Sequence, residues 1–118
     1  MIKFTAPIEP VPFKRVQWNG NHRFTDPRYR NFKDALSWYA LQAMHGNKPL
    51  KGAIKLLVDV FKHGNTTSLN FGDHDNHLKA VSDALNGICY VDDRQIVESR
   101  VRLHSGEPHI VIELEEIK

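Results

Sequence analysis

The residues that could carry out chemistry gather in one short acidic stretch, residues 72–79, followed by the pair Asp92-Asp93. Asp73 and Asp75 are two residues apart, and in extended chain their side chains would leave the same side. Two carboxylates held this close repel each other unless a cation lies between them. Because oxygen ligands of this kind suit Mg²⁺ or Mn²⁺ better than zinc, the pattern predicts a site for a hard divalent cation.

Two further groups could complete this site. Asp92 and Asp93 lie at the start of a predicted strand, and they would meet the first pair if both strand ends flank the same helix. Lys79 follows Asp75 by four residues, so both lie on one helix face, where the ammonium could steady a negatively charged substrate. The alternative is that Asp73 and Asp75 are turn and helix-cap residues, with Asp75 and Lys79 as a surface ion pair. Spacing alone leaves both interpretations open.

Other chemistries do not match the residues. A calcium-binding EF-hand counted from Asp73 would need Gly and Glu where the chain has Leu78 and Ala84. His74, His77 and Cys89 lack the spacing of zinc ligands, and no phosphate-binding or dinucleotide-binding glycine motif is present. The single cysteine, Cys89, lies among apolar residues and is predicted to be a small core residue.

The hydrophobic pattern predicts the elements that must position the acidic residues. One helix should begin at Asp26-Pro27, with Asp as N-cap and Pro as first helical residue, and end by Gly46. A second helix should run from about residue 76 to 86. Strands are predicted at 2–6, 52–62, 95–103 and 109–114, with an exposed loop or hairpin at 14–25. The order β-α-β-α-β-β indicates one small α/β domain, residues 1–118, with a mixed sheet and two main helices.

The net charge of +2 is unevenly distributed along the chain. Residues 1–50 hold eight Lys and Arg against three Asp and Glu, whereas residues 51–118 hold eight against eleven. This asymmetry indicates a basic arm for a polyanion, or simply an uneven surface charge. No apolar run approaches the roughly 20 residues of a membrane span, and the N-terminus is too polar for a secretory signal. We therefore expect a cytoplasmic protein with no membrane partner.

The acidic stretch resembles the signature of the RusA family of Holliday junction resolvases. That signature is Asp-x-Asp-Asn-x-x-Lys, then Asp-Ala-Leu, then Asp-Asp-x-Gln followed by Ile or Val. The chain contains Asp73-His-Asp75-Asn76-His-Leu-Lys79, then Asp83-Ala-Leu, then Asp92-Asp93-Arg-Gln95-Ile, in the same order. The N-terminal half is similar more loosely, through its proline-rich start, Lys14-Arg15 and Phe24-Thr25-Asp26-Pro27.

The resemblance implies a homodimeric, Mg²⁺-dependent endonuclease, in which Mn²⁺ can substitute, that resolves four-way DNA junctions by paired symmetric nicks in recombination and repair. Such proteins act in bacterial cells and are often encoded by phages or prophages. Asp73, Asp75 and Asp93 would bind the metal and catalyse, with Lys79 assisting. Asn76 and Asp92 would lie next to the metal-binding carboxylates, with Asn76 orienting one of them. Asp83, inside the helix, would be structural.

One departure from the family concerns DNA binding. Family members often carry Arg or Lys just before the first motif Asp, but residues 64–72 hold no charge. Phosphate contacts are therefore predicted from elsewhere, or the basic cluster is only a solvated face; its members are Lys14, Arg15, Arg23, Arg28, Arg30 and Lys33. Trp18, within this basic segment, could stack on an opened base or contribute to a dimer surface. Two other functions stay open: a DNA-binding protein that does not cut, and a nuclease of flaps or other branches.

Overall fold

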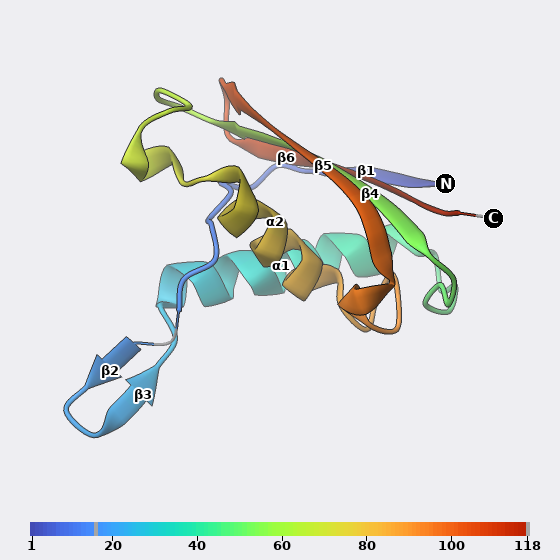
Figure 1. Ribbon diagram of the computed structural model, residues 1–118, viewed down its shortest axis with the longest axis horizontal. Coiled ribbons are helices and arrows are strands. Elements are labelled where there is room, and N and C mark those ends of the chain that lie inside the picture. The colour runs from blue at the N-terminus through green and yellow to red at the C-terminus, as the bar shows by residue number, and fades with distance from the viewer. Residues whose placement is uncertain (16, 118) are drawn as a thin grey trace.

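A four-stranded sheet with two helices packed on one face forms the body of the protein, in a computed structural model that describes residues 1–15 and 17–117 (Figure 1). The strand order is β1 (Ile2–Ala6), β6 (His109–Glu116), β4 (Ile54–Lys62) and β5 (Ile96–Ser105). β4 and β5 are parallel, whereas β6 is antiparallel to both β1 and β4. The helices are α1 (Pro27–Ala43) and α2 (His74–Leu85). The predicted fold class, a mixed sheet with two main helices, is confirmed.

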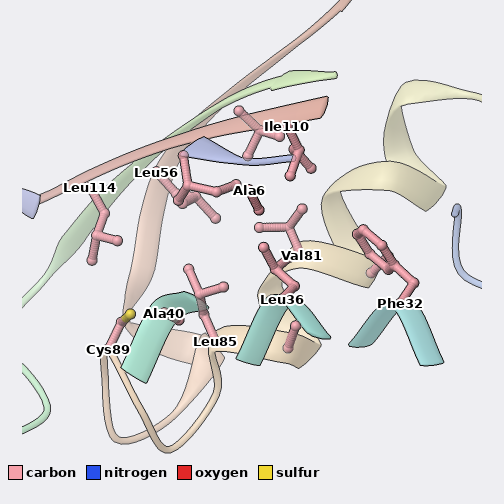
Figure 2. Close-up of a cluster of buried hydrophobic side chains, with 14 of the residues drawn as sticks. Ala6, Phe32, Leu36, Ala40, Leu56, Val81, Leu85, Cys89, Ile110 and Leu114 are labelled. Atoms are coloured by element: carbon pink, nitrogen blue, oxygen red, sulfur yellow. The ribbon is translucent and has the colours of Figure 1, made fainter. Parts of the chain in front are cut away.

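Alternating side chains explain why this sheet holds its helices on one side. Along β4 every second residue is buried, and along β6 Ile110, Ile112 and Leu114 are buried in the same way. These apolar rows pack against the inner faces of the helices, where Leu36 of α1 and Val81 of α2 meet the sheet (Figure 2). Cys89 is fully buried beside them, as predicted.

Local capping determines where the first helix begins. The Asp26 carboxylate accepts a hydrogen bond from the Arg28 amide at 2.8 Å, and Pro27 occupies the first helical position. The predicted start is therefore confirmed, and the helix ends at Ala43, three residues before Gly46. β5 and β6 each extend two residues beyond their predicted C-terminal ends, where pairing with β4 continues the ladder, whereas β4 begins two residues and β5 one residue later than predicted.

Three short elements complete the fold. The predicted loop or hairpin is a hairpin of β2 (Gln17–Asn19) and β3 (His22–Phe24), which projects from the body at the end where α1 begins (Figure 1). Two 3-10 turns, η1 (Leu69–Phe71) and η2 (Asp93–Gln95), precede α2 and β5. Within the described residues, no helix combines the length and apolar character needed to cross a membrane.

Candidate functional site

Asp73 is the N-cap of α2, and Asp75 lies in the first turn of that helix. The Asp73 carboxylate accepts a hydrogen bond from the Asn76 amide at 2.9 Å, so the helix starts two residues earlier than predicted. The expectation that residues 73–75 form extended chain, with both carboxylates on one side, is therefore wrong. Both side chains are exposed where the unpaired amides of the helix end carry partial positive charge, which favours carboxylates.

A buried polar network holds the turn in front of Asp73. The Phe71 carbonyl accepts hydrogen bonds from the Lys62 ammonium at 3.2 Å and from Nε2 of His77 at 2.8 Å. Lys62 is 8% exposed and His77 only 1%, and burial lowers the pKa of both groups. Sequence reasoning missed Lys62, although the period of β4 places it on the same face as Val60, toward the core.

An open groove of about 510 Å³ begins at Asp73. Its wall includes Lys14, His74 and Asn76, and the segment before Asp73 adds the neutral polar residues Thr66, Thr67 and Ser68. The uncharged segment before Asp73 therefore contributes neutral hydrogen-bonding groups, while the positive charge in the groove comes from Lys14, which is distant in sequence. Of the predicted metal ligands and DNA-binding residues, the structure thus brings Asp73 and Lys14 to one groove.

Lys79 points toward the C-terminal half of α2. Asp75, Lys79 and Asp83 follow one another at four-residue intervals on one face of the helix. The Lys79 ammonium lies 3.8 Å from the Asp83 carboxylate and 4.8 Å from the ring centre of Phe13. Asp75 instead has Nε2 of His74 at 3.2 Å. The alternative interpretation was therefore right about the Asp73 cap and wrong about an Asp75–Lys79 ion pair.

Asp92 is the N-cap of the turn η2 and Asp93 is its first residue; this turn is hydrogen-bonded to the loop after α1. Asp92 accepts from the Arg94 amide at 3.2 Å, and the Gln95 side chain accepts from the Asp92 amide and donates to the Leu50 and Gly52 carbonyls. The Arg94 amide lowers the pKa of Asp92. The hydrogen bond with Asp92, partial burial and the neighbouring negative charges raise the pKa of Asp93.

The three predicted metal ligands do not meet within one chain. Asp93 lies near Asp83 and Lys79, whose charges act on its pKa. Asp73 lies ten residues before Asp83, about 15 Å along the helix axis. Among the described residues, no three His, Cys, Asp or Glu side chains are close enough to hold a metal ion.

Asp83, predicted to be structural, makes two polar contacts in this region. Besides pairing with Lys79, it accepts a hydrogen bond from the Tyr29 hydroxyl at 3.2 Å. Burial and the charge of Asp83 raise the pKa of that hydroxyl. The four-residue spacing between Lys79 and Asp83 is the sequence signal for their ion pair. The charges of both residues also act on Asp93, which lies near the C-terminal half of α2.

The predicted DNA-binding residues lie in and around the β2–β3 hairpin, and Lys14 among them also lines the groove. Lys14 pairs with Asp26 at 3.0 Å, and the Arg23 guanidinium lies 5.9 Å from the ring centre of Trp18. All five side chains are exposed; they are Lys14, Arg15, Arg23, Arg28 and Arg30. They occupy the segment before the hairpin, the hairpin itself and the first turn of α1 (Figure 1). Together they form the basic arm of the protein.

Comparison with known proteins agrees with this arrangement of motifs. The family model described as endodeoxyribonuclease RusA matches residues 7–115. A protein of Bacillus subtilis (strain 168), described as the uncharacterized protein YqaN, is 41% identical, and the match covers 98% of this chain and 96% of that protein. This chain therefore belongs to the RusA family of endodeoxyribonucleases.

Proposed function

We propose that this protein is a Mg²⁺-dependent endodeoxyribonuclease that resolves four-way DNA junctions by paired symmetric nicks. Family membership supports nuclease chemistry. The observation that carries the proposal is the position of Asp73 and Asp75, which lie exposed at the N-terminus of α2, beside a groove that Lys14 borders. Carboxylates can hold a cation there while the basic arm holds the phosphates on either side of the scissile bond.

The carboxylates fit magnesium in chemistry, but one chain does not close them around one ion. Asp73 and Asp75 lie at one end of α2, and Asp93 lies at the other. A homodimer, which the family resemblance implies, would offer Asp93 of a second copy to the first pair. The ion, when bound, lowers the pKa of an attacking water and stabilises the charge that grows on the phosphate oxygens.

The chain's own residues contribute positioning and charge. The Asn76 amide orients the Asp73 carboxylate, and the Phe71 carbonyl, held by Lys62 and His77, keeps the preceding turn in place. The half-exposed ammonium of Lys79 can move to contact a DNA phosphate, because its ion pair with Asp83 is long, at 3.8 Å. Two copies related by two-fold symmetry would present two such sites to two strands of a junction.

The test compares Asp75→Asn with Asp34→Asn on labelled four-way, flap and linear duplex DNA, with and without Mg²⁺. Asp34 is exposed on α1 and serves as a matched loss of one carboxylate. Asp75→Asn should abolish cleavage while junction binding stays equal or tightens, because a charge that repels DNA is gone. Asp34→Asn should cut like the unaltered protein.

Each other outcome identifies a different error. Unimpaired cutting by Asp75→Asn would show that Asp75 is not a metal ligand. Binding of junctions without cutting by the unaltered protein would favour a DNA-binding protein that does not cleave. Preferential cutting of flaps would move the substrate from four-way junctions to other branches. Binding that does not weaken with salt would remove the basic arm from the DNA contact.

A further inference from the structure

We infer that the β2–β3 hairpin carries a stacking site for an unpaired nucleotide, formed by the Trp18 ring with the guanidinium groups of Arg23 and Arg30. This inference rests on the proposed function and specifies which part of a branched DNA the arm would hold. It begins from the register of the hairpin, in which Trp18 lies directly opposite Arg23. The Arg23 guanidinium lies 5.9 Å from the ring centre, within the range of a cation–π contact.

The exposure of Trp18 is not explained by packing. Its side chain is 67% exposed, on a hairpin that stands away from the sheet and the helices (Figure 1). Two strands of three residues each are a marginal structure on their own, and a large ring in solvent adds little burial to stabilise them. The cation–π contact with Arg23 orients the ring while leaving much of its surface accessible.

A notch of about 340 Å³ adjoins the same arginine. It is lined by Arg23, Phe24, Thr25 and Arg30, which provide two guanidinium groups, one hydroxyl and one aromatic ring without any carboxylate. In the part of the chain that the structure describes, neither Arg23 nor Arg30 takes part in an ion pair. A guanidinium group binds phosphate through two parallel hydrogen bonds. Arg23 therefore links a phosphate-binding notch with an aromatic ring.

The combination favours an unpaired nucleotide over the other occupants. Every base has a flat face that stacks on an aromatic ring, but in an intact duplex these faces are covered by neighbouring base pairs. A branch point or a single strand exposes them. A second copy of the arm is disfavoured because it would bring the same cations, Lys14, Arg15, Arg23 and Arg30, against each other.

The test uses the fact that the chain has only two tryptophans. In Trp38→Phe, Trp18 alone fluoresces, and in Trp18→Phe, Trp38 alone does. Both proteins are titrated without divalent metal with an oligo-dT strand, a four-way junction and a linear duplex, so that no cleavage interferes. The single strand and the junction should quench Trp18 strongly and the duplex weakly, while Trp38 fluorescence should not change. Trp18→Ala should bind oligo-dT about ten-fold more weakly, and Trp18→Phe should recover most of that loss.

The outcomes separate this inference from the proposed function. If Trp18 is not quenched, and Trp18→Ala binds oligo-dT as the unaltered protein does, the stacking site is refuted, even where junctions are still cut with Mg²⁺. If Trp18 is quenched by oligo-dT while no branched DNA is cut, the stacking site stands and the nuclease proposal fails. Thermal melting of Trp18→Ala checks its folding, and the quenching of Trp38→Phe decides the question independently of that variant.

Discussion

Gly72, the residue directly before Asp73, offers the sharpest test of how the site is held. Its φ is +86°, in the left-handed region that L-residues rarely adopt. A Cβ added there would lie 2.7 Å from Cγ of Pro12 and 3.1 Å from Nε2 of His77. A proline ring cannot rotate away, so the turn or the Pro12 segment would have to move.

Two effects set the expected loss of stability in Gly72→Ala. The φ of +86° and ψ of +146° at Gly72 define a backbone conformation that essentially only glycine adopts, and it costs another residue about 1–3 kcal/mol. Forcing a methyl group into a filled space costs about 1–3 kcal/mol more. The total expected reduction in the free energy of unfolding is therefore about 2–6 kcal/mol, measured by urea unfolding. Cleavage should also fall at temperatures where the variant is folded, because a displaced turn moves Asp73.

Gly87 provides a control with a similar φ but open surroundings. Its φ is +80°, nearly the same as at Gly72, but nothing lies within 4 Å of an added Cβ. Gly87→Ala should therefore lose only the backbone part, about 1 kcal/mol. Equal losses of stability in the two variants would refute the argument, since they would show that the contact between residue 72 and Pro12 relaxes freely.

Two further predictions concern the sheet and the assembly. Asp59 is partly buried, which raises its pKa, but hydrogen bonds from Arg102 and His104 outweigh burial and lower the pKa overall. A carboxyl group whose pKa is lowered by folding stabilises the fold at pH values above its ordinary pKa, and this contribution is lost as the pH falls through the lowered pKa. Asp59→Asn should therefore reduce the free energy of unfolding by up to about 1 kcal/mol at pH 7 and progressively less below about pH 4, measured by urea unfolding. An equal loss at pH 3 and pH 7 would contradict this sign. Asp75→Asn and Asp93→Asn should each be inactive, yet a mixture refolded together should regain about a quarter of the nicking, since half of the dimers would keep one intact site assembled from both copies. The absence of any recovery would place Asp93 in the site of its own chain.

Much of the fold could be predicted because its signals are local. Alternation along β4 and the Asp26-Pro27 cap of α1 depend on residues that are neighbours in sequence, and both predictions are confirmed. The same kind of local signal failed at α2. There the spacing of the acidic residues predicts extended chain, but an Asp three residues before Asn76 is also a typical N-cap, and the structure has the cap.

The buried polar groups were harder to foresee. Lys62 has the correct period for the core, but a lysine is seldom buried unless a partner satisfies it. That partner, the Phe71 carbonyl, is nine residues away and is presented by the turn η1. No periodic pattern indicates such a contact, because it depends on how the loop between β4 and α2 folds back onto the end of the strand.

The sequence by itself determined the family, the types of the main elements and the identity of the acidic residues, because motif order and periodicity are properties of the chain alone. Only the tertiary structure decided their partners. It placed Lys14 beside the groove at Asp73, directed Lys79 to Asp83, and put Asp93 at the opposite end of α2. These distances follow from how the apolar faces of α1 and α2 pack on the sheet, and that packing joins segments far apart in sequence. For this reason the three carboxylates predicted to cluster are separated in a single chain, with Asp73 and Asp75 at the N-terminal end of α2 and Asp93 in η2 near its other end.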